Sequence, residues 1–372
     1  MTKSMTSNHP VTNINSTIEN IRIIDPQTDH TWDEFVEQHP NGWICHLSGW
    51  KTLIEASFSH IKGYYIVKYD PMDGTICAGL PIYFVKSFLT GKRLVSAPFA
   101  TLFDPLYRNE TDLTALAEAA ILMCDNLKSS FIEIRSFNTD GLKADNRFKA
   151  ECFYKHHYIS LSEEPDVLKK GFHRTCVRQR INRALESDIR LEISESDQGM
   201  KDFYSVYLIT RKRTSLPPMP YRFFKSLWDI FYPSGKISVL LAHKQNKTLA
   251  GMILFKYKNR VSAEFAASDE HYKHISPNHF LFWQAINLAY DEGYSIFDFG
   301  RTSLNNQSLL DFKNHWATST FDLANYMYTG NSSNGQTAAD KKLGYKLMRK
   351  INQFLPQRAY PKFGEFCYRH LG

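Results

Sequence analysis

Apolar residues follow the same order of spacings in both halves of the chain. Each half has three runs with strand-like apolar spacing, then a long apolar stretch at helical spacing, then a short apolar run with a polar end. In the first half these segments are 64–69, 75–85, 93–98, 113–127 and 131–135, and in the second half they are 236–243, 248–256, 260–267, 278–292 and 294–299. The pattern predicts three strands, a helix and a further strand, twice.

The intervals between the two series indicate a duplicated α/β unit. The interval from Tyr64 to Ile237 equals the interval from Thr75 to Thr248. An ordered series of elements at nearly constant offset is the mark of an internal repeat. We therefore predict two domains of similar fold, an N-terminal domain over residues 21–160 and a C-terminal domain over residues 161–330. A disordered polar lead is expected over residues 1–20, and a linker with a helical tail over residues 331–372.

Further helices are expected around this repeat. Thr31 and Glu34 have the spacing of a capping box, which predicts a helix that starts there. Other helices are expected at 48–58, 203–210 and 221–231, and a first strand at 21–24. The stretch Ala338–Gln353 predicts a basic helix with one apolar face, which either packs on the protein body or lies on a membrane surface.

The composition narrows the class of protein. The chain of 372 residues is 43% apolar and 22% charged, which is typical of a soluble globular protein. Its formal net charge of +7 suits an anionic ligand and does not by itself indicate DNA binding. No apolar run approaches the roughly 20 residues of a membrane span, and the polar start lacks the apolar core of a signal peptide.

The cysteines and histidines predict neither disulfides nor a metal site. Six cysteines are scattered without a C-x-x-C pair, and the fourteen histidines contain no H-E-x-x-H. This usage is typical of a protein in a reducing compartment, so a cytoplasmic location is expected.

The strongest candidate for a functional site is the end of the strand predicted at 294–299. There Asp298, Gly300 and Arg301 follow one another closely, and Phe312 and Lys313 come shortly afterwards. Ligands of α/β sheets commonly lie at the carboxyl ends of strands, a glycine lets the backbone approach a ligand, and an arginine offers a fork for phosphate or carboxylate. An Asp–Arg pair that fixes a turn is the alternative interpretation.

A second candidate is the basic helix expected after residue 173. Arg174, Arg178, Arg180 and Arg183 lie off the face formed by its apolar positions. They form either a phosphate-binding face or an ordinary solvated face.

The second half resembles the acyltransferase domain of the GNAT superfamily that is shared with Fem-type aminoacyltransferases, of the FemAB-like and BioF2-like kind. The resemblance covers about residues 30–330 and depends on the order of many short motifs. These are the basic helix 174–186, Phe203-Tyr204, 210–213, 249–251, 266–268, Pro277-Asn278, 297–301 and Phe312-Lys313, with Trp50, 79–81 and 94–99 in the first half. The resemblance implies tandem GNAT-like domains of the α/β (α+β) class, each a mixed, mostly antiparallel sheet flanked by helices.

The resemblance also implies a reaction, the transfer of an acyl or aminoacyl group from an activated donor to a primary amine. By motif, Lys313 would contact the substrate or the developing oxyanion. Asp298 would act as a base or orient Arg301, and Arg301 would bind a phosphate or carboxylate. Gly300, Phe312, Arg174 and Arg178 complete the expected substrate site.

One departure from the family's pattern concerns the donor. GNAT enzymes hold the pyrophosphate of CoA in a glycine-rich turn at a helix N-terminus, whereas the equivalent stretch here, 272–278, has no glycine. Lys273, Ser276 and Asn278 are the residues expected to hold a phosphate there. The donor stays open between acyl-CoA, acyl carrier protein and aminoacyl-tRNA, with no tightly bound cofactor expected.

The leading hypothesis is a cytoplasmic N-acyltransferase that uses acyl-CoA and acts on an amine-bearing sugar or peptide precursor of the cell envelope or of an exopolysaccharide. The first alternative is a tRNA-dependent Fem-type aminoacyltransferase of peptidoglycan. The chain also lacks a long charged coiled-coil arm of the kind some Fem enzymes carry, which weakens that alternative. The second alternative is a non-catalytic GNAT-like scaffold that binds a nucleotide-linked sugar or a partner protein.

Overall fold

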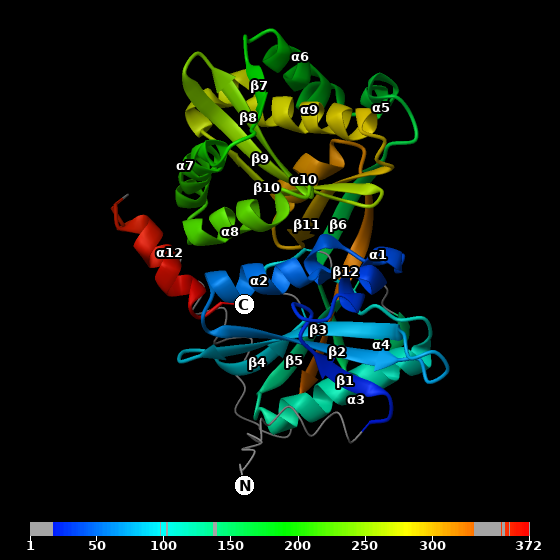
Figure 1. Ribbon diagram of the computed structural model, residues 1–372. Coiled ribbons are helices and arrows are strands. Elements are labelled where there is room, and N and C mark those ends of the chain that lie inside the picture. The colour runs from blue at the N-terminus through cyan, green and yellow to red at the C-terminus, as the bar shows by residue number, and fades with distance from the viewer. Residues whose placement is uncertain are drawn as a thin grey trace. The chain divides into compact units, whose positions relative to one another are not determined.

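The computed structural model describes residues 18–96, 98–101, 103–136, 140–330, 351, 354–356 and 358–371. The chain divides into two compact units (Figure 1). Unit 1 contains residues 1–152, 324–336 and 370–372, and unit 2 contains residues 153–323 and 337–369. The basic tail helix expected at Ala338–Gln353 lies outside the described residues, apart from residue 351.

Unit 1 is built on a sheet whose strands lie in the order β1-β2-β3-β4-β5-β12. All neighbouring strands in it are antiparallel except β4 and β5, which are parallel. The strands are β1 (Ile21–Ile24), β2 (Ile61–Tyr69), β3 (Ile76–Ser87), β4 (Gly91–Val95), β5 (Phe131–Ser136) and β12 (Ser319–Thr329). The helices are α1 (Thr31–Gln38), the short 3-10 helix η2 (Ile44–His46), α2 (Ser48–Ser57), α3 (Glu110–Asn126) and α4 (Asp140–Lys143).

Unit 2 repeats this sheet, with its strands in the order β7-β8-β9-β10-β11-β6. Again one pair, β10 and β11, is parallel and the other neighbours are antiparallel. The strands are β6 (Lys149–Ser160), β7 (Arg190–Ile193), β8 (Ile237–Lys244), β9 (Lys247–Tyr257), β10 (Arg260–Ser268) and β11 (Ile296–Ser303). The helical segments are α5 (Pro165–Gly171), η3 (Arg174–Arg178), α6 (Gln179–Leu185), α7 (Asp197–Arg213), α8 (Tyr221–Phe231), η4 (Glu270–Ile275), α9 (Pro277–Asp291), α10 (Gln307–Asn314) and α12 (Tyr360–Tyr368).

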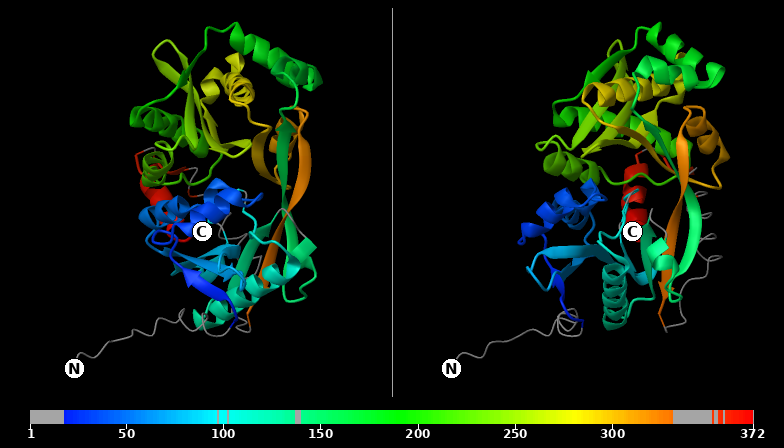
Figure 2. Two further views of the ribbon diagram at one scale, coloured as in Figure 1. Left: turned by 45° about the vertical axis from the view of Figure 1, so that its right-hand side comes forward. Right: turned by 90° about the vertical axis from the view of Figure 1, so that its right-hand side faces the viewer.

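Both sheets are covered by helices in the same way. In unit 2, Ala250, Met252 and Leu254 of β9 join the core beneath α9, whereas Gly251 faces Phe203 of α7, so α7 and α9 lie on opposite sides of the sheet (Figure 2). A Cβ at Gly251 would lie 2.9 Å from the Phe203 ring. In unit 1, a Cβ at Gly79 of β3 would overlap the ring of Trp32 on α1. In each unit a glycine in the third strand of the sheet order leaves room for an aromatic ring to pack against that strand.

The sixth strand of each sheet is exchanged between the repeats along the chain. β6 follows β5 in sequence but pairs with β11 in unit 2, and β12 follows β11 but pairs with β5 in unit 1. The fold expectation, tandem mixed sheets flanked by helices, is confirmed. This exchange was not predicted, because the sequence pattern of a strand carries no record of the strand it pairs with.

Two local predictions differ from the structure. The residue before α1 is His30, and Thr31 lies inside the helix, where its hydroxyl donates to Asp29, so the capping box of Thr31 and Glu34 is wrong. The single basic helix expected after residue 173 begins as a π-helical turn, η3, and only then continues as α6. A π-helical turn changes which side chains share a face, so the arginines of η3 do not follow the spacing of an α-helix.

Candidate functional site

The candidate site lies around a bulge in β11. The pairing of β11 with β6 shifts in register between Asp298 and Gly300, so that Phe299 is the extra residue. Gly300 has a φ of 72°, a left-handed conformation that glycine adopts without steric cost. A β-bulge bends its strand and re-aims the groups beside it. Here it turns the backbone of Gly300 and Arg301 toward α10.

Lys313 of α10 is held by this bulge. Its side chain is 5% exposed, and its ammonium group donates to the carbonyl oxygens of Gly300 at 2.9 Å and Arg301 at 3.1 Å. Burial lowers the pKa of Lys313 to about 8, although the charges of Asp298 and Glu264 act in the opposite direction. Two of the three ammonium protons are used by the carbonyls, which leaves the group able to reach one further acceptor.

Asp298 is completely buried behind the bulge. Its Oδ2 lies 3.0 Å from Arg260 Nη1 and 2.9 Å from His156 Nε2, and its Oδ1 accepts the N–H of Gly300. Burial raises the pKa of Asp298, but His156, Arg260 and the Gly300 N–H outweigh burial and hold the pKa below its usual value. The expectation that Asp298 orients Arg301 is wrong, because Asp298 pairs with Arg260.

Arg301 and Phe312 also lie on the elements around the bulge. The guanidinium of Arg301 lies 4.8 Å from the centre of the Tyr154 ring, a cation–π distance. The Phe312 ring packs in an aromatic cluster with His279, Phe282 and Trp316. Phe312 therefore anchors α10, and its contact with a substrate stays a prediction.

Arg174 and Arg178 lie together at an open pocket of about 340 Å³. The pocket is lined by Asp166, Lys169, Lys170, Arg174, Arg178, Gln179 and Asn182. Lys169 donates to Asn182 at 3.1 Å, which braces one side of the pocket. Four cations against one carboxylate make the pocket suitable for a phosphate or other anion.

Lys273, Ser276 and Asn278 lie at the start of α9, as expected from the sequence. Lys273 is exposed on η4, and Ser276 is buried at the junction with a φ of 58°. The left-handed turn that glycine would usually form is thus made by a serine, at a cost of about 1–2 kcal/mol. Pro277 starts the helix, and the helix N-terminus beyond it is a favourable place for an anion. Strained backbone of this kind gathers at functional sites.

The part of unit 2 that contains the bulge is similar to a known protein family. Residues 171–314, which include the bulge, α9 and Lys313, match the family model of the acetyltransferase (GNAT) domain. These residues form a GNAT acetyltransferase domain, and the chain is an acyltransferase. No curated protein matches the chain significantly.

Solved structures that share the fold align with most of the chain. FemX is 18% identical with a TM-score of 0.67, over 88% of this chain and 99% of FemX. L-PGS from Bacillus licheniformis is 15% identical with a TM-score of 0.54, over 89% of this chain and 98% of its own. A tandem GNAT protein from the clavulanic acid biosynthesis pathway is 9% identical with a TM-score of 0.55, over 84% of this chain and 100% of its own. At these identities the likeness concerns the fold.

Three residues of unit 2 were missed by the sequence reasoning. Arg260 begins β10, and the register of β10 with β11 brings it to Asp298. His156 lies on the exchanged strand β6, opposite Arg301. Glu264 stands at a bulge of β10, between Ala263 and Phe265, and its charge acts on Lys313. No local signal marks these residues, because only the pairing of distant strands gathers them.

Within the described part of the chain, none of the helices combines the length and apolar character needed to cross a membrane.

Proposed function

We propose that this chain is an N-acyltransferase that moves an acyl group from acyl-CoA to a primary amine of a cell-envelope or exopolysaccharide precursor. The observation that carries the proposal is the buried Lys313, held by the Gly300 and Arg301 carbonyls inside the GNAT domain. A buried ammonium group that is fixed by two carbonyls is already oriented, so it can stabilise developing negative charge without reorganising.

The reaction needs an oxyanion stabiliser at the donor carbonyl. The neutral amine attacks the thioester carbon, the carbonyl oxygen becomes an oxyanion, and collapse of the tetrahedral intermediate expels the CoA thiolate. Lys313 in its charged form donates to that oxyanion through its remaining N–H. With a pKa of about 8, part of Lys313 is neutral in mildly alkaline solution, and this part is inactive in the role. At equal concentrations of the neutral amine, transfer therefore falls as the pH rises through about 8.

The attacking amine must also lose a proton, and Glu264 is the proposed acceptor. It is half-buried at the bulge of β10, close enough to influence Lys313, and Ser262 donates to its Oε1 at 2.9 Å. Asp298 is a poorer base, because both of its oxygens are occupied and its pKa is lowered. In this scheme Asp298 and Arg260 are positioning residues that fix the bulge.

The phosphates of the donor are assigned to the start of α9. Lys273, Ser276 and Asn278 surround that helix end, and the backbone N–H groups of a first helical turn favour anions. Arg174 and Arg178 are assigned to an anionic group of the acceptor, such as a phosphate or the pyrophosphate of a nucleotide-linked sugar.

A paired assay tests the proposal. The purified chain is incubated with acetyl-CoA or longer acyl-CoA and a panel of nucleotide-linked amino sugars and short peptides, and products are read by mass spectrometry. The expected product carries the acyl group on the amine, and Glu264→Gln loses most turnover while it still binds CoA. Turnover by Glu264→Gln equal to that of the wild type would overturn its role. Absence of any acylated product over the panel, together with no binding of CoA, would overturn the donor.

The open basic pocket supports a second candidate, in which the donor is aminoacyl-tRNA. Lys169, Lys170, Arg174 and Arg178 would then contact the nucleic-acid backbone. Such binding weakens steeply as salt rises, because counterions are released from the phosphates. This candidate is excluded if the affinity of the chain for a charged tRNA changes less than twofold between 50 and 200 mM salt. It is also excluded if the charged tRNA yields no transfer.

A further inference from the structure

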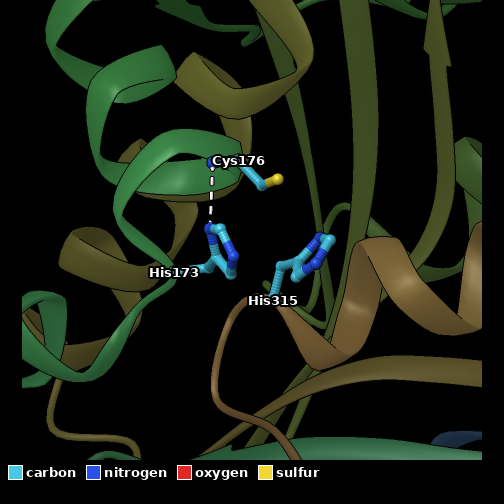
Figure 3. Close-up of side chains that lie close together, drawn as sticks. All are labelled: His173, Cys176 and His315. Atoms are coloured by element: carbon cyan, nitrogen blue, oxygen red, sulfur yellow. Dashed lines mark hydrogen bonds between the residues drawn. The ribbon is translucent and has the colours of Figure 1, made fainter.

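Three side chains of types that bind metals meet where η3 lies beside the end of α10. They are His173, just before η3, Cys176 within η3, and His315 at the end of α10. One potential ligand atom from each side chain lies within 4.8 Å of the others (Figure 3). In the sequence the H-x-x-C pair and His315 are far apart, so no spacing motif announces them.

Backbone N–H groups of both His173 and Cys176 help to hold this cluster together. The N–H of His173 donates to the carbonyl oxygen of His315 at 2.8 Å, and the two imidazole ring centres are 4.6 Å apart. The N–H of Cys176 donates to Nδ1 of His173 at 3.2 Å, the bond drawn in Figure 3. Two segments that are distant in sequence therefore present their ligands from fixed backbone positions.

The chemistry of the three ligands points to zinc. Two imidazole nitrogens and one thiolate form a set that zinc binds with tetrahedral geometry. Zn–N bonds of about 2.0–2.1 Å and a Zn–S bond of about 2.3 Å place tetrahedral ligand atoms about 3.3–3.6 Å apart. Because the ligand atoms lie within 4.8 Å of one another, each separation needs to close by at most about 1.5 Å, which rotation of the exposed His173 side chain and the half-buried Cys176 and His315 side chains provides. The fourth position is left to water.

Two features oppose binding and limit its strength. The metal competes with the N–H of Cys176 for the one lone pair of the neutral His173 imidazole. Arg174 and Arg178 on the same turn add positive charge near the ion, although they also offset a thiolate at Cys176. We therefore expect the site to fill at moderate zinc concentration, and we expect the chain to fold without zinc.

We propose that His173, Cys176 and His315 bind one zinc ion, and that the ion clamps the end of α10 to η3. His315 follows two residues after Lys313, and the carbonyl oxygen of Lys313 accepts the N–H of Trp316 and the hydroxyl of Thr318. A clamp at His315 thus limits the motion of the helix end that positions Lys313. The expectation of no metal site, drawn from sequence spacing alone, is replaced by this proposal.

The test uses the full chain without a histidine tag, reduced and freed of metal, and titrated with Co²⁺ as a spectroscopic probe and then with Zn²⁺. We expect one cobalt per chain with a thiolate-to-cobalt absorption band, which zinc displaces. Cys176→Ser abolishes the band, and His173→Ala and His315→Ala lower zinc affinity at least tenfold. The matched controls are Cys152→Ser and His274→Ala, an exposed cysteine and an exposed histidine outside the cluster, which leave the titration unchanged.

Thermal unfolding of the metal-free variants separates loss of binding from loss of fold, and His315→Gln serves as a second variant if His315→Ala unfolds. Amide exchange at Trp316 and Ala317 is expected to slow when zinc is added to the wild type. Absence of a cobalt–thiolate band at saturating cobalt, or its persistence in Cys176→Ser, would overturn the site. Unchanged exchange at Trp316 and Ala317 despite zinc binding would overturn the clamp.

Discussion

Strands β5 and β11 occupy equivalent places in the two sheets. Each pairs in parallel with the strand that precedes it along the chain, and each pairs antiparallel with an exchanged strand on its other side. Both contain a carboxylate at the same position, Glu133 in β5 and Asp298 in β11. What surrounds these carboxylates differs.

In β5 the carboxylate makes an ordinary strand-surface pair. Glu133 accepts from Arg135 two residues later at 2.9 Å, and the two side chains are 20% and 16% exposed. In β11 the residue aligned with Arg135 is Gly300, the strand bulges, and Asp298 is fully buried with partners from other strands. The comparison shows that the two strands differ at this position, where the glycine of β11 allows the bulge that presents two carbonyls to Lys313.

The helices that follow these strands sharpen the contrast. Lys143 ends α4 after β5 and is exposed, whereas Lys313 lies in the last turn of α10 after β11 and is buried. The largest expected effect separates these two lysines. Lys313→Ala should lower kcat by about 10²–10³-fold, the cost of removing one oxyanion donor, and Lys143→Ala should leave kcat within about twofold. Steady-state kinetics with the same substrates measure both, and equal effects would remove the functional distinction between the units.

The two carboxylates should differ in what they contribute to stability. Asp298→Asn leaves Arg260 and His156 without their buried partner and should lower the free energy of unfolding by about 3 kcal/mol. Glu133→Gln removes a partly exposed pair and should cost less than about 1 kcal/mol. Urea denaturation gives both values, and a loss for Glu133→Gln as large as that for Asp298→Asn contradicts the prediction.

The bulge itself can be probed at the aligned positions. Gly300→Ala puts a Cβ on a residue with a φ of 72° and should cost about 1–2 kcal/mol of stability. It should also lower kcat, because the Gly300 carbonyl that holds Lys313 moves. Arg135→Ala in β5 is the control and should leave kcat unchanged. If Gly300→Ala retains full kcat, the bulge does not position Lys313.

The last prediction is a pH dependence of stability. The pKa of Lys313 is about 8 in the folded chain, against 10.5 for an ordinary lysine. Between these two pH values the unfolded chain binds the extra proton, so the contribution of Lys313 to stability rises with pH across this window. The stability of the wild type relative to Lys313→Met should therefore increase from pH 8 to pH 10.5, as measured by urea midpoints. A constant or falling difference would show that Lys313 is not buried in this way.

Much of the fold could be predicted from the sequence, but the contacts of the site could not. The helix at Tyr221–Phe231 and the strand at Ile21–Ile24 have the predicted bounds. The family resemblance predicted roles for Lys313 and Asp298 in the site. The sequence did not show that Asp298 pairs with Arg260, because that pairing depends on the register of β10 with β11.

By itself, the sequence determined the order of the elements and the duplication, because apolar periods of 2 and 3.6 residues are local properties that survive in each repeat. Only the tertiary structure decided the exchange of β6 and β12, the partners of Asp298, and the meeting of His173 and Cys176 with His315. Each of these depends on which strand or helix end packs beside another, and that choice is made by the sum of many long-range contacts rather than by any short stretch of residues.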